Sequence, residues 1–372
     1  MTQTQTTHRP THSNSIRLNR WKTAAALLLL PASLASAHTN APPTRLEEVV
    51  VEGREDSLVG IADTAAQGTV GAKQLEMRTI SRPGEVLETV PGVIITQHSG
   101  AGKANQFFLR GFNLDHGTDF ATSIDGMPGN MPTHGHGQGY PALNILIPEL
   151  VQRVNYKKGV YFAEEGDFSS AGAVDIELFD TLPSSIAVLE GGSFGYARGL
   201  FASSPDLGPG HLLYGLELFH NDGPWEHPDG YKKFNGTVRY SQGDASCGFS
   251  ITGMGYFGDW DATDQIAQRA LDQGIVNRFG SLNPDSGGTS QRYSLMGEWH
   301  RNDAESATRL MAYGFYYDLD LFSDFTYFLN DPDNGDQFHQ HEDRWTTGVK
   351  GSHTWFHTLG ERDIETTIVL QS

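Results

Sequence analysis

The second half of the sequence alternates apolar residues with polar or small residues at a period of two. This period is typical of β-strands, because successive side chains of a strand point to opposite faces of its sheet. Each alternating run is about as long as the 9–11 residues of a tilted membrane-spanning strand. The runs therefore predict strands with one face for lipid and one for a lumen. In one run, the first face carries Leu212, Tyr214, Leu216 and Leu218, and the second carries Leu213, Gly215, Glu217 and Phe219.

The connections between these runs alternate between short and long. This alternation favours a membrane barrel with tight turns on one side and extended loops on the other, because a soluble sandwich has no reason to sort its connections by side. We count about nine strands, whereas a large plugged barrel needs about 22, so we expect an N-terminal fragment or a truncated product. The short connections are 205–210, 242–246, 301–306 and 357–362, and the long ones are 222–232, 258–288 and 319–343.

Charge and the N-terminal segment limit the partners and the compartment. The formal net charge of −19 argues against nucleic-acid binding, since phosphates repel an acidic surface. Residues 1–37 predict a secretory signal, because basic residues precede an apolar core over 24–34 and Ala35-Ser36-Ala37 offers a cleavage site. The core is far shorter than the roughly 20 residues of a spanning helix, so a membrane anchor is the weaker interpretation. Cys247 is the only cysteine, which excludes an intramolecular disulfide.

The segment 83–177 is rich in glycine and in turn signals. Short apolar runs in it end at dipeptides that suit tight turns with positive φ, namely Pro91-Gly92, Arg110-Gly111 and Asp125-Gly126. They predict a small sheet. The motifs LETVPGV, LRGF and SIDG follow one another here, and in this order and spacing they resemble the plug domain of TonB-dependent outer-membrane receptors.

This resemblance implies a mainly β chain. An N-terminal α+β plug domain would occupy 61–180, and 181–372 would be the start of a roughly 22-stranded antiparallel transmembrane β-barrel. One departure from the family is the end of the plug, which reads AEEGDFSSAGAVDIE. The role of its added acids, Glu164, Glu165 and Asp167, stays open.

Four residues of the turn motifs are candidates for structural roles in the plug: Arg110, Gly111, Asp125 and Gly126. Arg110 has two interpretations. It either holds the plug against the barrel through an acidic partner or stabilises only the plug sheet. The candidate partners are Glu85, Glu88 and Glu149.

Residues 38–60 predict a periplasmic linker, and the segment LEEVVVEG at 46–53 resembles a TonB box. Its β-prone run suits addition of a strand to a partner sheet. The implied partner is the periplasmic TonB protein with its inner-membrane energising complex, since the chain has no phosphate-binding GxxxxGK[ST] motif. The alternative is an ordinary first strand of the plug. The residues expected to contact TonB are Glu47, Glu48, Val49, Val50 and Val51.

A Gly-rich loop at 127–140, MPGNMPTHGHGQGY, carries the first candidate ligand site. Neutral imidazoles and carboxylates bind zinc and other borderline divalent ions, so His134 and His136 are candidate metal ligands. The alternative is that the loop needs only polar residues that tolerate unusual backbone angles. The candidate ligand-binding residues are Asp115, His116, His134, His136, Gln138 and Tyr140, with Asp119 nearby.

A second candidate is the acidic segment DPDNGDQFHQHED at 331–343. Oxygen-rich loops capture calcium, but Gly335 falls one place too early for an EF-hand, which favours a solvated acidic loop. Its titratable residues are Asp331, Asp333, Asp336, His339, His341, Glu342 and Asp343.

The sequence carries no GxSxG, HExxH, CxxC or dinucleotide-binding motif in a suitable context, so an enzyme is not expected. The resemblance implies a receptor in the outer membrane, in contact with its lipid, that imports a scarce extracellular ligand. An iron–siderophore complex or another metal species is the preferred ligand. A non-metal cofactor, an oligosaccharide and a non-functional fragment are the alternatives. No cofactor is required, and a metal ion or chelate enters as the ligand.

Overall fold

A computed structural model of the protein describes residues 61–372 except 63, 98 and 99. The predicted signal at 1–37, the linker at 38–60 and the TonB-box residues Glu47, Glu48, Val49, Val50 and Val51 lie outside the described residues. The described residues belong to one compact unit. They form two parts, an N-terminal domain over 61–180 and a sheet domain over 181–372.

The N-terminal domain is built around a six-stranded sheet of order β1-β2-β8-β9-β6-β7. All neighbours in it are antiparallel except β6 and β9, which are parallel. Its strands are β1 (Ile61–Ala62), β2 (Gln67–Gly71), β6 (Phe120–Ile124), β7 (Met127–Pro128), β8 (Val151–Lys158) and β9 (Gly172–Leu178).

A smaller sheet and short helices complete this domain. The small sheet has the order β3-β4-β5. Its strands are β3 (Val93–Thr96), β4 (Gln106–Leu109) and β5 (Phe112–Asn113), and the helices are α1 (Ala72–Glu76), η1 (Pro83–Thr89), η2 (Leu143–Ile145) and η3 (Pro148–Leu150).

The predicted glycine turns are confirmed. Arg110 and Gly111 join β4 to β5 with φ values of 53° and 84°, and Asp125 and Gly126 join β6 to β7 with values of 48° and 81°. Two successive positive φ angles define the two-residue hairpin turn whose twist matches that of its strands. Glycine adopts this conformation without a steric penalty, and aspartate tolerates it.

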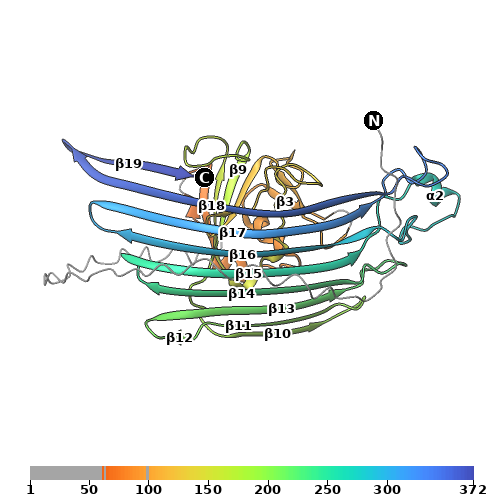
Figure 1. Cartoon of the computed structure of the whole chain (residues 1–372), viewed down its shortest axis with the longest axis horizontal. Helices are drawn as coiled ribbons and strands as arrows, with labels where there is room; N and C mark the ends of the chain where they lie inside the picture. The colour runs from red at the N-terminus through yellow and green to blue at the C-terminus, as the bar shows by residue number, and fades with distance from the viewer. Residues whose placement is uncertain (1–60, 63, 98–99) are drawn as a thin grey trace. The chain divides into compact units, whose positions relative to one another are not determined.

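The sheet domain is a single antiparallel sheet of ten strands (Figure 1). Nine of them pair in the order β10-β11-β13-β14-β15-β16-β17-β18-β19, which confirms the predicted count of about nine. The short β12 pairs with β13 beside this path. The strands are β10 (Ile186–Gly191), β11 (Ala197–Ser203), β12 (Asp206–Leu207), β13 (Gly210–Asn221), β14 (Tyr231–Gly243), β15 (Cys247–Asp261), β16 (Gly287–Asn302), β17 (Ser306–Ser323), β18 (Phe338–Leu359) and β19 (Arg362–Gln371).

The predicted faces of the strands are confirmed by burial. On β13, Leu213 and Glu217 are 0% and 1% exposed, whereas Leu216 and Leu218 are 50% and 63% exposed. Buried and exposed side chains thus alternate along the strand, so one face carries an acid into the interior and the other presents leucines outward. We call these the inner and outer faces of the sheet.

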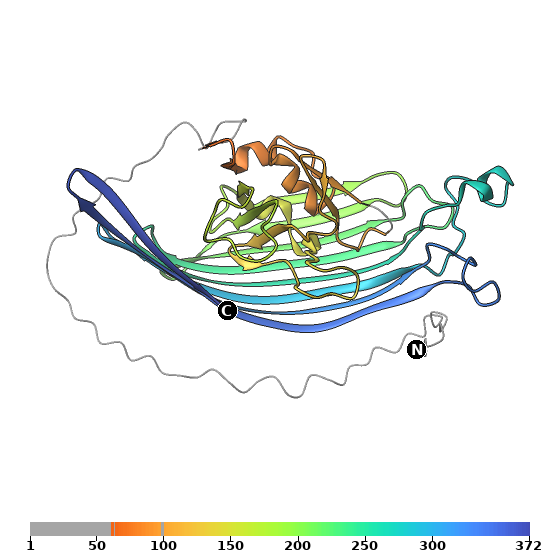
Figure 2. The ribbon, with the colours of Figure 1, turned by 90° about the horizontal axis from the view of Figure 1, so that it is seen from above.

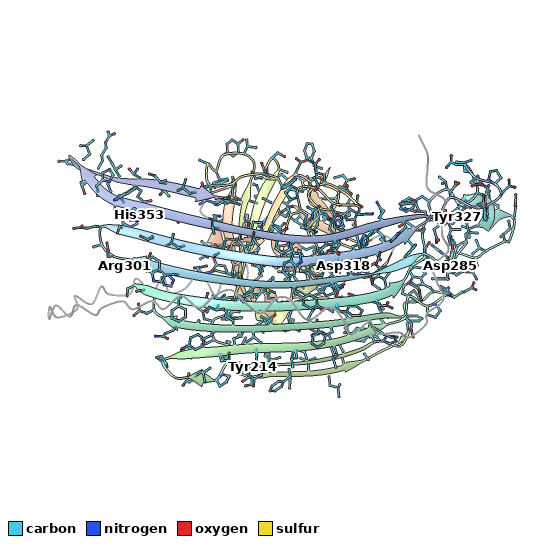
Figure 3. All side chains as sticks on the ribbon, in the orientation of Figure 1. Tyr214, Asp285, Arg301, Asp318, Tyr327 and His353 are labelled. Atoms are coloured by element: carbon cyan, nitrogen blue, oxygen red, sulfur yellow. The ribbon has the colours of Figure 1, made fainter. Side chains whose placement is uncertain are left out.

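The long and short connections lie at opposite ends of the sheet. Figure 3 marks the long-loop end by Tyr327 and Asp285 and the short-turn end by Arg301 and His353. The loop after β17 is shorter than predicted, because β17 and β18 extend to Ser323 and Phe338. The loop after β15 contains a helix that the sequence did not predict, α2 (Gln268–Asp272).

The N-terminal domain packs on the inner face of the sheet (Figure 2). One hydrophobic cluster contains Val86 and Ile176 of the domain together with Leu213 and Met254 of the sheet, all of them buried. This shared core fixes the domain on the sheet, which positions the candidate site.

None of the helices in the described part of the chain is long and apolar enough to cross a membrane.

Candidate ligand-binding site

The Gly-rich loop after β7 is anchored by one buried amide. Asn130 Nδ2 donates to the backbone oxygens of Gly117, Phe120 and Gly139 at 2.9, 3.1 and 2.9 Å. Its Oδ1 accepts the backbone N–H of Thr122 at 2.7 Å. Because Asn130 is only 8% exposed, these four bonds have little competition from water. The amide therefore fixes both ends of the loop against β6.

The loop brings two imidazoles together. His116 Nε2 lies 3.1 Å from His136 Nε2. On the far side of each ring, His116 Nδ1 is 3.0 Å from the backbone oxygen of Asn105, and His136 Nδ1 is 2.8 Å from Gln340 Oε1 on β18. Gln340 Nε2 donates to the oxygen of Gly135 at 2.7 Å, which fixes the orientation of the amide. Both Nδ1 atoms therefore donate to oxygen.

His134 lies differently from this pair. Its ring stacks on Tyr140 with centroids 4.0 Å apart and an interplanar angle of 7°. Its Nδ1 accepts the backbone N–H of His136 at 3.1 Å. The ring of His136 thus contacts the ring nitrogen of His116, which lies in a turn before β6. The ring nitrogen of His134, the other histidine of the HxH motif, contacts the backbone of His136.

Burial keeps the imidazoles of His116 and His134 neutral. Burial, and to a smaller extent the neighbouring His136, lower the pKa of His116 to about 4. Burial also lowers the pKa of His134 to about 3, with smaller contributions from the charges of His136 and Arg344. Neutral imidazole is the form that binds metal ions.

The sheet closes over the loop through inward side chains of β18. Glu342 Oε2 accepts the backbone N–H of Gly135 at 2.9 Å, and Arg344 donates to Thr133 Oγ1 at 2.9 Å. Arg344 Nε also donates to Glu342 Oε1 at 2.8 Å. Sequence reasoning placed Glu342 in an acidic loop, but it lies on a strand. The alternation of Gln340, Glu342 and Arg344 is the signal that could have revealed this inner face.

The other candidate residues in or near this loop are Tyr140, Asp115, Gln138 and Asp119. Tyr140 is fully buried and its hydroxyl accepts the backbone N–H of Ala104 at 2.7 Å, and burial raises the pKa of Tyr140. The side chain of Asp115 is 57% exposed, with Oδ1 3.7 Å from His116 Nε2. Gln138 is exposed, and Asp119 accepts a hydrogen bond from Ser170.

The acidic segment divides into a turn and a strand. Asp336 accepts the backbone N–H groups of Leu329, Asn330 and Asp331, and Asp331 accepts those of two residues after it. These carboxylates stabilise their own turn instead of converging on a calcium ion, whereas Asp333 is exposed.

His339, His341 and Asp343 belong to β18. His339 Nε2 and His341 Nδ1 lie 2.8 and 3.0 Å from Asp320 Oδ1 on β17. Asp320, His339 and His341 are the one group of three or more potential metal ligands with all donor atoms within 4.8 Å in the described part of the chain. The two histidines alternate with Gln340 and Glu342, so they lie on the outer face of the sheet, away from the N-terminal domain.

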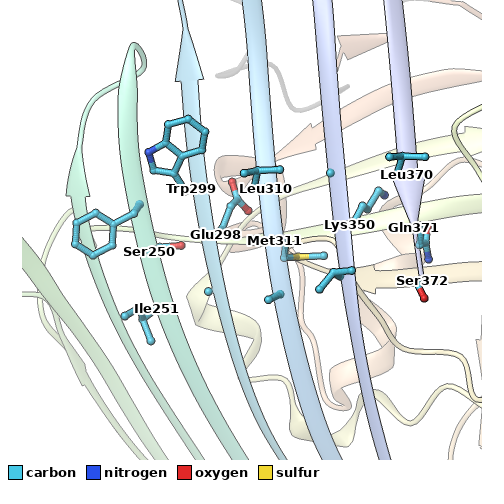
Figure 4. Close-up of a pocket in the computed structure, with 15 residues that line it drawn as sticks. Ser250, Ile251, Glu298, Trp299, Leu310, Met311, Lys350, Leu370, Gln371 and Ser372 are labelled. Carbon is cyan, nitrogen blue, oxygen red and sulfur yellow. The ribbon is translucent and has the colours of Figure 1, made fainter. Parts of the chain in front are cut away.

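A separate concavity of about 700 Å³ lies over β15 to β19. Trp299, Leu310 and Leu370 contribute to its lining (Figure 4) and are 37%, 51% and 74% exposed on the outer face. It contains none of the histidines and is not part of the site.

The N-terminal domain matches a known family. Residues 61–173 match the family model described as the TonB-dependent Receptor Plug Domain. This segment is therefore similar to the plug domain of TonB-dependent receptors. The resemblance predicted from LETVPGV, LRGF and SIDG is thereby confirmed.

Solved structures share the fold of plug and sheet together. The ferric citrate transporter FecA in the unliganded form aligns with a TM-score of 0.67 and 13% identity over 82% of this chain and 46% of its own. The copper transporter OprC aligns with a TM-score of 0.61 and 18% identity over 83% and 45%. The ferripyoverdine receptor of the Pseudomonas aeruginosa outer membrane aligns with a TM-score of 0.61 and 14% identity over 82% and 41%. The present chain thus spans less than half the length of these structures.

Ion pairs join the plug to the sheet. Arg198 on β11 forms a bidentate pair with plug Glu149 at 2.7 and 2.8 Å. Arg239 on β14 pairs with plug Asp125 at 2.9 Å. The side chains of Arg198 and Arg239 are 11% and 10% exposed, and those of Glu149 and Asp125 are 30% and 6% exposed. Asp125 thus serves both the β6–β7 turn and the attachment of the plug.

Of the two interpretations of Arg110, the structure does not support attachment of the plug to the sheet. Arg110 is exposed at the tip of the β4–β5 hairpin. Its expected partners are engaged elsewhere, since Glu149 pairs with Arg198, Glu85 Oε2 accepts the backbone N–H of Ser81, and Glu88 accepts that of Ile95. The attaching arginines come from inward positions of the sheet.

The added acids near the end of the plug have a local partner. Lys157 Nζ on β8 lies 2.7 Å from both Glu164 Oε1 and Glu165 Oε1, and Asp167 is exposed. The two glutamates therefore fasten the segment after β8 to that strand.

Proposed function

We propose that the protein is a TonB-dependent receptor of the outer membrane that imports a metal species with energy supplied through TonB. The observation that carries this proposal is that the histidine cluster is built from both domains. His116 and His136 come from the plug, and Gln340 comes from β18. A ligand bound there would contact plug and sheet together, so displacing the plug would dismantle the site and release the ligand.

The comparisons support a metal species as the ligand class. The similar structures include one titled a ferric citrate transporter, one titled a copper transporter and two titled siderophore receptors. Imidazoles such as those of the plug loop are suited to metal ions or their chelates. An iron–siderophore complex or another metal species is therefore the proposed cargo.

The other parts of the proposal concern the chain around the site. Residues 1–37 would direct export, and the exposed leucines of the outer face, such as Leu216 and Leu218, would face outer-membrane lipid. Residues 46–53 would add a strand to TonB. Force on that segment would act against the buried pairs Arg198–Glu149 and Arg239–Asp125, which hold the plug in place.

Uptake in metal-limited cells tests this proposal. Cells producing the protein are compared with cells producing a variant that lacks 46–52, and accumulated metals are measured by elemental mass spectrometry. The deletion is expected to abolish energised uptake and to spare ligand binding at the cell surface. A deletion of equal length at 39–45 is the matched control, with outer-membrane levels checked for all variants. Undiminished uptake without 46–52 would contradict the proposal.

A further inference from the structure

We infer that Asp320, His339 and His341 form a binding site on the outer face of the sheet for a borderline transition-metal cation such as Zn²⁺, Cu²⁺ or Ni²⁺. The inference goes beyond the proposed function, because the site lies on the opposite face of the sheet from the plug and does not concern the imported cargo. The sequence led only to the expectation of a solvated acidic loop for the surrounding segment 331–343.

The register of β17 and β18 gathers the three side chains. Asp320 is the direct cross-strand partner of His341. His339 lies two residues away on the same face of β18, so both imidazoles reach the same carboxylate. His339 Nε2 and His341 Nδ1 lie 2.8 and 3.0 Å from Asp320 Oδ1. The ring of His339 also stacks on its cross-strand partner Phe322, with centroids 4.4 Å apart and an interplanar angle of 7°, which holds it beside the carboxylate.

The distances between the donor atoms suit a single ion. In a tetrahedral zinc site with bonds of about 2.0–2.1 Å, two ligand atoms lie about 3.3 Å apart. The two nitrogen–oxygen distances here are slightly shorter, and no two of the three donor atoms are more than 4.8 Å apart. The three side chains are between 41% and 52% exposed, so small rotations would bring the donor atoms around an ion without moving either strand. The ion would replace the protons that now join the imidazoles to the carboxylate.

The ligand types decide the class of ion. Imidazole nitrogen suits zinc, copper and nickel, whereas magnesium and calcium prefer sites made of oxygen. Two imidazoles with one carboxylate therefore favour a borderline ion over a hard ion. Three protein ligands leave at least one further position of the ion for water.

The site lies where an ion in water can reach it. On the outer face, Tyr316 and Trp345 are cross-strand partners with ring centroids 5.2 Å apart, as expected of aromatic residues at the edge of the apolar band of a membrane barrel. From this pair toward the long-loop end the outer face is polar, because Asp318 lies opposite Asp343 and the site follows. The site is therefore outside the apolar band, and the two neighbouring acids raise the local concentration of cations.

Calorimetric titration of the purified protein in detergent with Zn²⁺, Cu²⁺ and Ni²⁺, and with Mg²⁺ as the hard-ion control, tests the inference. All samples carry His134→Gln/His136→Gln, so that binding in the plug does not mask the outer face. We expect one ion per chain, whose affinity His341→Gln should lower by about 100-fold or more and Asp320→Asn by about 10–100-fold. The first change removes a ligand, and the second replaces a carboxylate by a neutral amide. His357→Gln, at an exposed histidine near the other end of β18, is the matched control and should leave the affinity unchanged.

Electron paramagnetic resonance of the Cu²⁺ complex in the same background gives an independent readout. Hyperfine coupling to two imidazole nitrogens is expected, and coupling to one is expected in His339→Gln. Absence of stoichiometric binding in this background, or binding that His341→Gln leaves unchanged, would overturn the inference. Either result leaves the proposed function to the uptake experiment with the deletion of 46–52, since no plug residue belongs to this site.

Discussion

Substitution of Glu149 by Gln should loosen the plug from the sheet. It replaces the two charge-assisted hydrogen bonds to Arg198, which are 2.7 and 2.8 Å long. Arg198 keeps a second carboxylate, because its Nε donates to Glu217 at 2.7 Å. Its charge is therefore not left uncompensated, so we expect a loss of about 2 kcal/mol, below the roughly 3–5 kcal/mol of a fully broken buried pair.

The assay follows the fluorescence of a tryptophan of the sheet that contacts the plug. Trp260 on β15 is fully buried, and a Cβ at plug Gly102 would lie 2.0 Å from its Cε3. Its fluorescence should change when urea releases the plug in detergent micelles, and a Trp260→Phe variant isolates its signal. A double-mutant cycle of Glu149→Gln with Arg198→Gln should give a coupling free energy of about 1.5–3 kcal/mol.

The control for this prediction is Arg110→Asn. Asn tolerates the positive φ of this turn, and Arg110 is exposed, so the midpoint of the transition should not move. A coupling free energy below about 0.5 kcal/mol between Glu149 and Arg198 would refute the attachment derived from their geometry. A large effect of Arg110→Asn would refute it as well.

Three further predictions concern the plug. Gly102→Ala should destabilise plug seating by about 1–3 kcal/mol through a clash with the β15 tryptophan, whereas Gly166→Ala, which meets nothing within 4 Å, should be neutral in the same urea assay. Burial lowers the pKa of His116 to about 4 and that of His134 to about 3, from 6.5 in the unfolded chain. Between these values the unfolded state binds more protons than the folded state, so the free energy of unfolding should fall as the pH drops below 6.5. The slope should be up to about 1.4 kcal/mol per pH unit for each histidine, and a pH-independent difference between the protein and its His116→Asn variant would contradict this. Asn130→Ala should cost about 3 kcal/mol by breaking four buried hydrogen bonds, measured by thermal unfolding, and an unchanged midpoint would show that the loop is anchored otherwise.

Features set by neighbouring residues could be predicted from the sequence. The turns at Arg110-Gly111 and Asp125-Gly126 depend on two adjacent φ angles, and the faces of β13 depend on a period of two. Both are local properties of the backbone. The start of β18 was missed because its acids and histidines resemble a solvated loop, whereas in the structure alternate side chains face the plug.

The candidate site depends on contacts between distant segments, which spacing does not determine. His116 and His136 meet because Asn130 anchors the loop and Gln340 turns one ring. Sequence reasoning named both histidines but joined His136 to the nearer His134. It likewise considered Arg110 for attachment of the plug, whereas the attaching arginines, Arg198 and Arg239, lie on strands of the sheet.

Anomalous X-ray scattering at the zinc absorption edge, from crystals of the protein grown with two equivalents of Zn²⁺, tests the account most directly. We predict one peak at the plug loop, beside His136 and facing Gln340 on β18. A peak only beside Asp320, His339 and His341, or no peak in the plug, would contradict the account.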